Sequence, residues 1–146
     1  MDEIRERVLD AAGKALARRA LSRAVLAERL ARIASPDVCA AVLDDLEQLG
    51  YVDDQALALA LAEQRLACGW GPGRVEADLE RLGVAEAAAR AGVRAAEAGE
   101  EAAARALLAS RAGAGRTPAQ RLGLLARRGF TADAAECVLG VLEDSP

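Results

Sequence analysis

Apolar positions recur along this chain at helical spacing, in stretches that short polar or glycine-containing breaks separate. Three breaks pair a cap-type residue with proline, the arrangement that starts a helix: Ser35-Pro36, Gly71-Pro72 and Thr117-Pro118. Other stretches end at a glycine, which can adopt the left-handed conformation that closes a helix. These glycines are Gly50, Gly69, Gly83, Gly99, Gly113 and Gly129.

These signals divide the chain into nine predicted helices with short loops between them. The predicted helices are Ile4–Arg19, Arg23–Ile33, Pro36–Leu49, Asp54–Cys68, Pro72–Leu82, Ala85–Ala98, Glu100–Ala112, Pro118–Arg128 and Ala132–Leu142.

The same pattern recurs at a fixed distance. Pro72 and Pro118 are 46 positions apart (118 − 72), as are Gly83 and Gly129 (129 − 83). A weaker copy lies 49 positions upstream, where Ser22 takes the place of Gly71. With three helices in each copy, the period predicts tandem three-helix repeats that bury their apolar faces partly against one another. The predicted repeats span residues 1–50, 51–98 and 99–146.

Composition supports an all-α fold. Of the 146 residues, 53% are apolar but only 2% are aromatic, and alanine and leucine, both strong helix formers, dominate. Alanine-rich stripes such as Ala58 and Ala62 allow close helix packing. We therefore predict three tandem three-helix repeats that form an elongated, curved helical array.

Several classes of protein are disfavoured. No apolar run reaches the roughly 18 residues that a membrane span needs, and the start of the chain is charged, so we expect a cytoplasmic protein without membrane association. The chain has no histidine, which disfavours hydrolase chemistry and, with only three cysteines, a metal site. Those cysteines are expected to be small core residues in a reducing compartment: Cys39, Cys68 and Cys137.

The motifs that could suggest catalysis have structural explanations. We expect Asp53 to cap the helix that follows it, and the Asp44-Asp45 pair to face solvent. The stretch 113–117 lacks the spacing of a phosphate loop and is predicted to be a flexible linker between repeats. Trp70, between two glycines, is predicted to pack at a helix corner. No constellation of acid, base and nucleophile emerges, and we expect a protein that is not an enzyme and needs no cofactor.

Charge is unevenly distributed. The net charge is -4, and all but one of the 19 basic residues are arginine, whose planar fork suits carboxylate and phosphate recognition. Basic residues gather near both ends and acids in the middle, which suits a long partner that carries both signs of charge. An ordinary solvated helical surface would also explain this pattern. The negative net charge and the scarcity of aromatic residues predict weak or no binding to DNA alone. The basic residues near the ends are Arg18, Arg19, Arg23, Arg29, Arg32, Arg121, Arg127 and Arg128.

Several segments together resemble the RecX family, regulators of the bacterial recombinase RecA. Leu49–Asp54 resembles a family joint of leucine, glycine, tyrosine, an apolar residue and two acids, and Gly69–Pro72 resembles the family's glycine, aromatic, glycine, proline turn. Ala17–Arg19 resembles the family's opening stretch, and Arg127–Phe130 resembles its third-repeat signature. The resemblance covers nearly the whole chain, and its motifs coincide with the repeats derived above.

The resemblance implies a curved array of three-helix repeats that lodges in the groove of the RecA filament on single-stranded DNA. There it would inhibit or modulate the ATPase, strand-exchange and co-protease activities of RecA in DNA repair, homologous recombination and the SOS response. We expect a monomer. The alternative is an armadillo-like helical adaptor that binds a different protein. The residues that fall on basic positions of the family, and are expected to contact filament or nucleic acid, are Arg18, Arg19, Arg23, Arg65, Arg74, Arg127 and Arg128.

Overall fold

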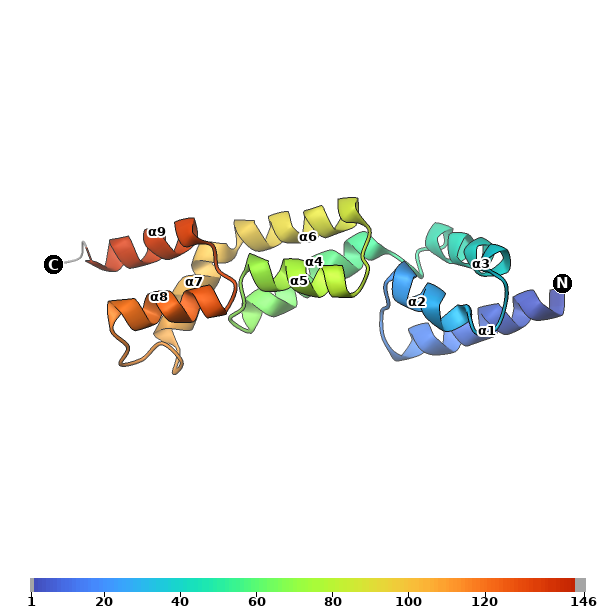
Figure 1. Ribbon diagram of the computed structural model, residues 1–146, viewed down its shortest axis with the longest axis horizontal. Helices are drawn as coiled ribbons and strands as arrows, with labels where there is room; N and C mark the ends of the chain where they lie inside the picture. The colour runs from blue at the N-terminus through green and yellow to red at the C-terminus, as the bar shows by residue number, and fades with distance from the viewer. Residues whose placement is uncertain (1, 144–146) are drawn as a thin grey trace.

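The computed structural model describes residues 2–143, and this part of the chain is α-helical without a strand, as predicted. The helices lie in an elongated row, with the two ends of the chain at opposite ends of the molecule (Figure 1). They are α1 (Asp2–Arg18), α2 (Arg23–Leu30), α3 (Pro36–Gln48), α4 (Asp54–Ala67), α5 (Pro72–Arg81), α6 (Glu86–Ala98), α7 (Glu100–Ala109), α8 (Pro118–Arg127) and α9 (Ala132–Glu143).

The predicted helix starts are confirmed where sequence capping signals were clear. The side chain of Asp53 accepts a hydrogen bond from the Ala56 amide at 3.0 Å and so caps α4. Thr117 and Gln120 form a reciprocal capping box at the start of α8. Two helices end three residues earlier than predicted, α2 at Leu30 and α7 at Ala109, because short turns follow them.

Three separate hydrophobic clusters follow one another along the row. One lies within α1–α3, one within α4–α6 and one within α7–α9, and we name these the first, second and third helix groups. Ala58 and Leu79 are fully buried in the second group, and their counterparts 46 positions later, Ala104 and Leu125, are fully buried in the third. The predicted repeats at 1–50, 51–98 and 99–146 are compatible with this arrangement and stay a prediction. Met1 and residues 144–146 lie outside the described residues.

The second and third groups meet through backbone contacts at glycine. The Gly71 amide donates to the Arg128 carbonyl at 2.7 Å, and the Gly73 amide donates to the Gly129 carbonyl at 2.8 Å. A Cβ on Gly71 would lie 2.7 Å from the backbone of Gly129, which has a φ of 84°. Both glycines are therefore needed for this close approach.

The first and second groups meet at the corresponding positions. The buried Ser22 hydroxyl donates to the Leu82 carbonyl at 2.6 Å. Ser22 lies 49 positions before Gly71, and Leu82 lies 46 positions before Arg128, so the start of a group's second helix meets the turn that follows the second helix of the next group. The Ser22 hydroxyl thus donates the hydrogen bond that corresponds to the one donated by the Gly71 amide at the joint between the second and third groups.

Carboxylates tie the helices together at a second pair of corresponding positions. Asp54 accepts hydrogen bonds from the amides of Arg23, at 2.9 Å, and Ala85, at 3.3 Å. Glu100, 46 positions later, accepts from the Thr131 amide at 2.8 Å and the Thr131 hydroxyl at 2.9 Å. Asp54, next to the capping residue Asp53, therefore has a structural role as well.

Three sequence predictions are wrong. Cys39 is buried as expected, but Cys68 and Cys137 are exposed. Cys68 follows the end of α4, and Cys137 of α9 forms a hydrogen bond with Glu101 of α7. Hydrogen bonding to that glutamate raises the pKa of the Cys137 thiol.

The glycines at 99 and 113 are not left-handed. Gly99 has a φ of −97° and joins α6 to α7 directly, while Gly115 has the positive φ after α7. The stretch 113–117 is not a linker between groups, because it connects α7 and α8, which share one hydrophobic cluster.

The glycine joint gives a stability prediction. We expect Gly71→Ala to lower the free energy of unfolding by about 1–3 kcal/mol, because the added methyl group meets backbone that cannot turn aside. Thermal unfolding followed by circular dichroism measures the change. Gly13→Ala is the control: Gly13 lies in α1 with open space around it, so alanine there should raise stability by about 0.5–1 kcal/mol. A Gly71→Ala protein as stable as the wild type would contradict the prediction.

Candidate functional site

Three arginines converge on one buried carboxylate in the second helix group. Asp78, on α5, is 2% exposed. It accepts a hydrogen bond from Nε of Arg65 on α4 at 2.6 Å and from Nε of Arg74, one turn earlier on α5, at 3.1 Å. Arg81, three residues later on the same helix, also pairs with it. The carboxylate therefore fixes α4 against α5 and holds three guanidinium groups at the surface around it.

The pairing keeps Asp78 ionised. Burial by itself would raise the pKa of the Asp78 carboxyl, but hydrogen bonds and charge from Arg65 and Arg74 outweigh burial and hold the pKa below its ordinary value of 3.8. An ionised acid that is this well surrounded by donors binds its own arginines and has no proton to donate near neutral pH.

Trp70 links this cluster to the third group. It lies in the turn between α4 and α5, as predicted for a corner residue, and it is half-buried. The guanidinium carbon of Arg74 lies 4.4 Å from its ring centroid, and that of Arg128 lies 4.6 Å from it. Two cation–π contacts thus connect one residue of the second group and one of the third through a single ring.

The structure brings together three of the seven arginines predicted for the site. Arg65, Arg74 and Arg128 gather around Trp70 and Asp78. Arg127, the last residue of α8, is exposed and has no ion-pair partner among the side chains of residues 2–140.

The remaining three lie in the first helix group, at the end of α1 and the start of α2. Arg18 and Arg19 are exposed and form no ion pair within the described part of the chain. Arg23 instead contacts Asp44 and Glu47 of α3, each at 2.8 Å. The hydrogen bond to Glu47, supported by Asp44, raises the pKa of Arg23 against the opposing effect of burial.

Sequence reasoning missed the central residue of the cluster. In the sequence, Asp78 is one of several acids that gather in the middle of the chain. Its role becomes visible only through its contacts with arginines from two helices. The spacing of Arg74, Asp78 and Arg81 contains a signal, because residues three and four apart lie on one helix face. The contribution of Arg65 depends on how α4 packs against α5 and has no such local signal.

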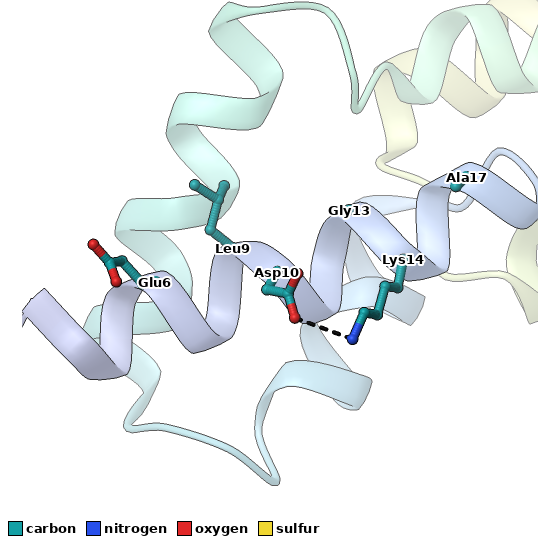
Figure 2. Close-up of a pocket in the computed structure, with 6 residues that line it drawn as sticks. All are labelled: Glu6, Leu9, Asp10, Gly13, Lys14 and Ala17. Carbon is teal, nitrogen blue, oxygen red and sulfur yellow. Dashed lines mark ion pairs between the residues drawn. The ribbon is translucent and has the colours of Figure 1, made fainter.

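The outer face of α1 carries a shallow hollow of about 490 Å³ (Figure 2). Its lining residues project from one side of the helix, and the ion pair between Lys14 Nζ and Asp10, 3.2 Å long, runs across it. Leu9 is 49% exposed there. Lys14 is the one basic residue of this lining and is paired with Asp10, and Glu6 adds a negative charge, so the hollow offers less to an anion than the exposed arginines do. The lining residues are Glu6, Leu9, Asp10, Gly13, Lys14 and Ala17.

The chemistry available at these surfaces is recognition of anions. Guanidinium groups bind carboxylates and phosphates through paired N–H donors. Within residues 2–143 no cluster of three or more potential metal ligands occurs, and no helix in that part of the chain is long and apolar enough to cross a membrane.

Comparison with known proteins gives a consistent result. The chain is 38% identical, over 135 residues, to "Regulatory protein RecX" of Halorhodospira halophila, covering 88% of this chain and 83% of that protein. It is 44% identical over 71 residues to "Regulatory protein RecX" of Thermus thermophilus, covering 49% of each. No protein-family model matches the chain.

Two solved structures share the fold. The crystal structure of RecX from Lactobacillus salivarius superposes with a TM-score of 0.84 at 17% identity and covers 98% of this chain and 99% of its own. A second crystal structure, of regulatory protein RecX, has a TM-score of 0.69 at 16% identity, with 92% and 72% covered.

The buried carboxylate gives a pH-dependent prediction. Because its folded-state pKa is lowered, Asp78 contributes stability that is fully present above pH 3.8 and is lost as the pH falls through the folded-state pKa. Asp78→Asn should therefore cost about 2 kcal/mol at neutral pH, and the difference from wild type should shrink in acid. Urea unfolding at a series of pH values measures it. Glu76→Gln, an exposed change on the same helix, should have little effect at any pH. A pH-independent cost of Asp78→Asn would contradict the assignment.

Proposed function

This chain belongs to the RecX family of regulatory proteins, and from that premise we propose that it binds the RecA filament on single-stranded DNA and inhibits or modulates its ATPase, strand-exchange and co-protease activities. The observation that carries the proposal is the 38% identity to a regulatory protein RecX over 88% of this chain. The protein acts by occupying a surface of the filament, as a regulator without a reaction of its own.

The shape and charge of the molecule support this proposal. The row of three helix groups exposes a long surface to a long partner (Figure 1). Among the seven arginines predicted for the site, Arg18 and Arg19 of the first group and Arg127 of the third have neither an ion-pair partner among the described side chains nor a contact with Trp70. These three residues are the first candidates for filament contacts, because their charges are not already neutralised.

The predicted arginines therefore have two different roles. Arg65 and Arg74 hold Asp78 within the second group, and Arg74 and Arg128 contact the Trp70 ring at the joint between the second and third groups. They support filament binding mainly by holding the two groups at a fixed angle. Arg23, paired with Asp44 and Glu47, supports the first group in the same way.

The net charge of -4 supports recognition that is directed at the filament and weak toward DNA alone. In this proposal the protein is a monomer in the cytoplasm, and its contacts are with RecA subunits, with DNA, or with both within the filament.

The first test is the DNA-dependent ATPase activity of the cognate RecA, titrated with this protein. We expect inhibition at low protein concentration and little binding to the same DNA without RecA. The double variant Arg18→Glu, Arg19→Glu should weaken inhibition roughly tenfold at low salt and less at high salt, because exposed charges are screened.

The control has the same change in net charge at another place. Arg94→Glu, Arg111→Glu reverses two exposed arginines outside the proposed contacts and should leave inhibition near the wild-type level. An equal loss of inhibition in both double variants would show a general effect of net charge and would contradict a specific role for Arg18 and Arg19. No inhibition and no filament binding by the wild type would reject the proposed function and leave a helical adaptor for another protein.

A further inference from the structure

Each group has an arginine at a corresponding position, at the end of its second helix or in the turn just after it. These residues are Arg32, Arg81 and Arg127, separated by 49 and 46 positions. The residue three positions earlier differs among the groups: it is Arg29 in the first group and Asp78 in the second. In the third group it is Leu124. Only the second group, therefore, has a carboxylate three positions before this arginine.

Burial supports this alignment of the helices. Leu30 of α2 and Leu79 of α5, 49 positions apart, are 1% and 0% exposed. Leu26 and Val75, also 49 apart, are both fully buried. Together with the matching joints at Ser22 and Gly71, these pairs place α2 and α5 in the same register.

The two helices differ in how their charges are satisfied. On α5, Arg81 pairs with Asp78. On α2 and the turn that follows it, Arg29 and Arg32 are both exposed, and neither has an ion-pair partner among the described residues. Two like charges three positions apart repel each other, and the negative end of α2 offsets only part of that repulsion. An added anion would relieve it.

Arg29 and Arg32 also share a cavity. With Glu28 they line a hollow of about 410 Å³ on the surface of the first group. The presence of a glutamate in the hollow, and the net charge of -4, disfavour a polyanionic strand, whereas one carboxylate needs only the two guanidinium groups. The second group shows which anion this position holds, since Arg81 there binds a carboxylate.

We propose that Arg29 and Arg32 form a binding site for a carboxylate side chain of a protein partner, which supplies to Arg32 the opposite charge that Asp78 supplies to Arg81 in the second helix group. The identity of that partner as a RecA subunit rests on the proposed function. The chemistry of the site, two guanidinium groups that bind one aspartate or glutamate, does not.

Two substitutions copy the other helix groups into the first. Arg29→Asp recreates the Asp78–Arg81 pair, so Arg32 is neutralised from within and the site is closed. Arg29→Leu recreates Leu124 beside Arg127 and leaves Arg32 free. We expect filament affinity to fall roughly tenfold for Arg29→Asp and roughly threefold for Arg29→Leu. Arg94→Asp, an exposed arginine on α6 with no ion pair in residues 2–143, is the control and should change affinity little.

Filament affinity separates this inference from the proposed function. The carboxylate site is supported if the wild type binds the filament and Arg29→Asp lowers filament affinity more than Arg94→Asp does. If the wild type binds the filament and Arg29→Asp has the same filament affinity, the carboxylate site is overturned while the proposed function stands. Circular dichroism checks that each variant keeps its helical content, as expected for exposed positions.

A second measurement decides the matter if the wild type does not bind the filament. The arginine Nε–Hε NMR signals of the protein are followed as hexaglutamate, or in a separate titration oligothymidine, is added. Saturable shifts of the Arg29 and Arg32 signals with hexaglutamate, absent for Arg32 in Arg29→Asp, would support the site. Absence of shifts, or tighter binding of oligothymidine at these two residues, would overturn it.

Discussion

The structure depends on the joint between successive helix groups, where the start of a group's second helix meets the turn after the second helix of the next group. An elongated row has no single core, and each group has its own small hydrophobic cluster. At the Gly71–Gly129 joint the backbones meet directly, and no side chain fits between them. Because the contact is between backbone groups, it fixes the distance and the angle between neighbouring groups together.

Side-chain contacts reinforce the joint between the second and third groups more than the joint between the first and second. Around the second joint, Asp78 gathers arginines from α4 and α5, and Trp70 connects Arg74 to Arg128 of the third group. At the joint between the first and second groups, the Ser22 hydroxyl donates the corresponding hydrogen bond, and the Asp54 carboxylate on α4 accepts a hydrogen bond from the Arg23 amide. The second and third groups are thus held by the contact of Arg128 with the Trp70 ring in addition to backbone hydrogen bonds, while the ion pairs of Asp78 stay within the second group.

The division of the arginines into two sets follows from these joints. Arginines that serve internal carboxylates or the Trp70 ring shape the scaffold, whereas those that have no ion-pair partner in the described chain are free to bind an external anion. A protein with a net charge of -4 can therefore present local positive surface without a general attraction to nucleic acid. For a regulatory protein, that combination favours a specific assembly over bare DNA.

The helices, most of their ends and their period could be predicted from the amino-acid order alone, because proline, glycine and cap residues act through their immediate neighbours. The sequence also identified Asp53 as a cap and the RecX family through ordered motifs. The ion pairs between helices and the burial of individual side chains follow from the packing of the helices. Asp78 pairs with Arg65 from another helix, and the exposure of Cys68 depends on what covers the end of α4. Contacts between residues distant in sequence depend on how helices pack, and local patterns do not encode that packing.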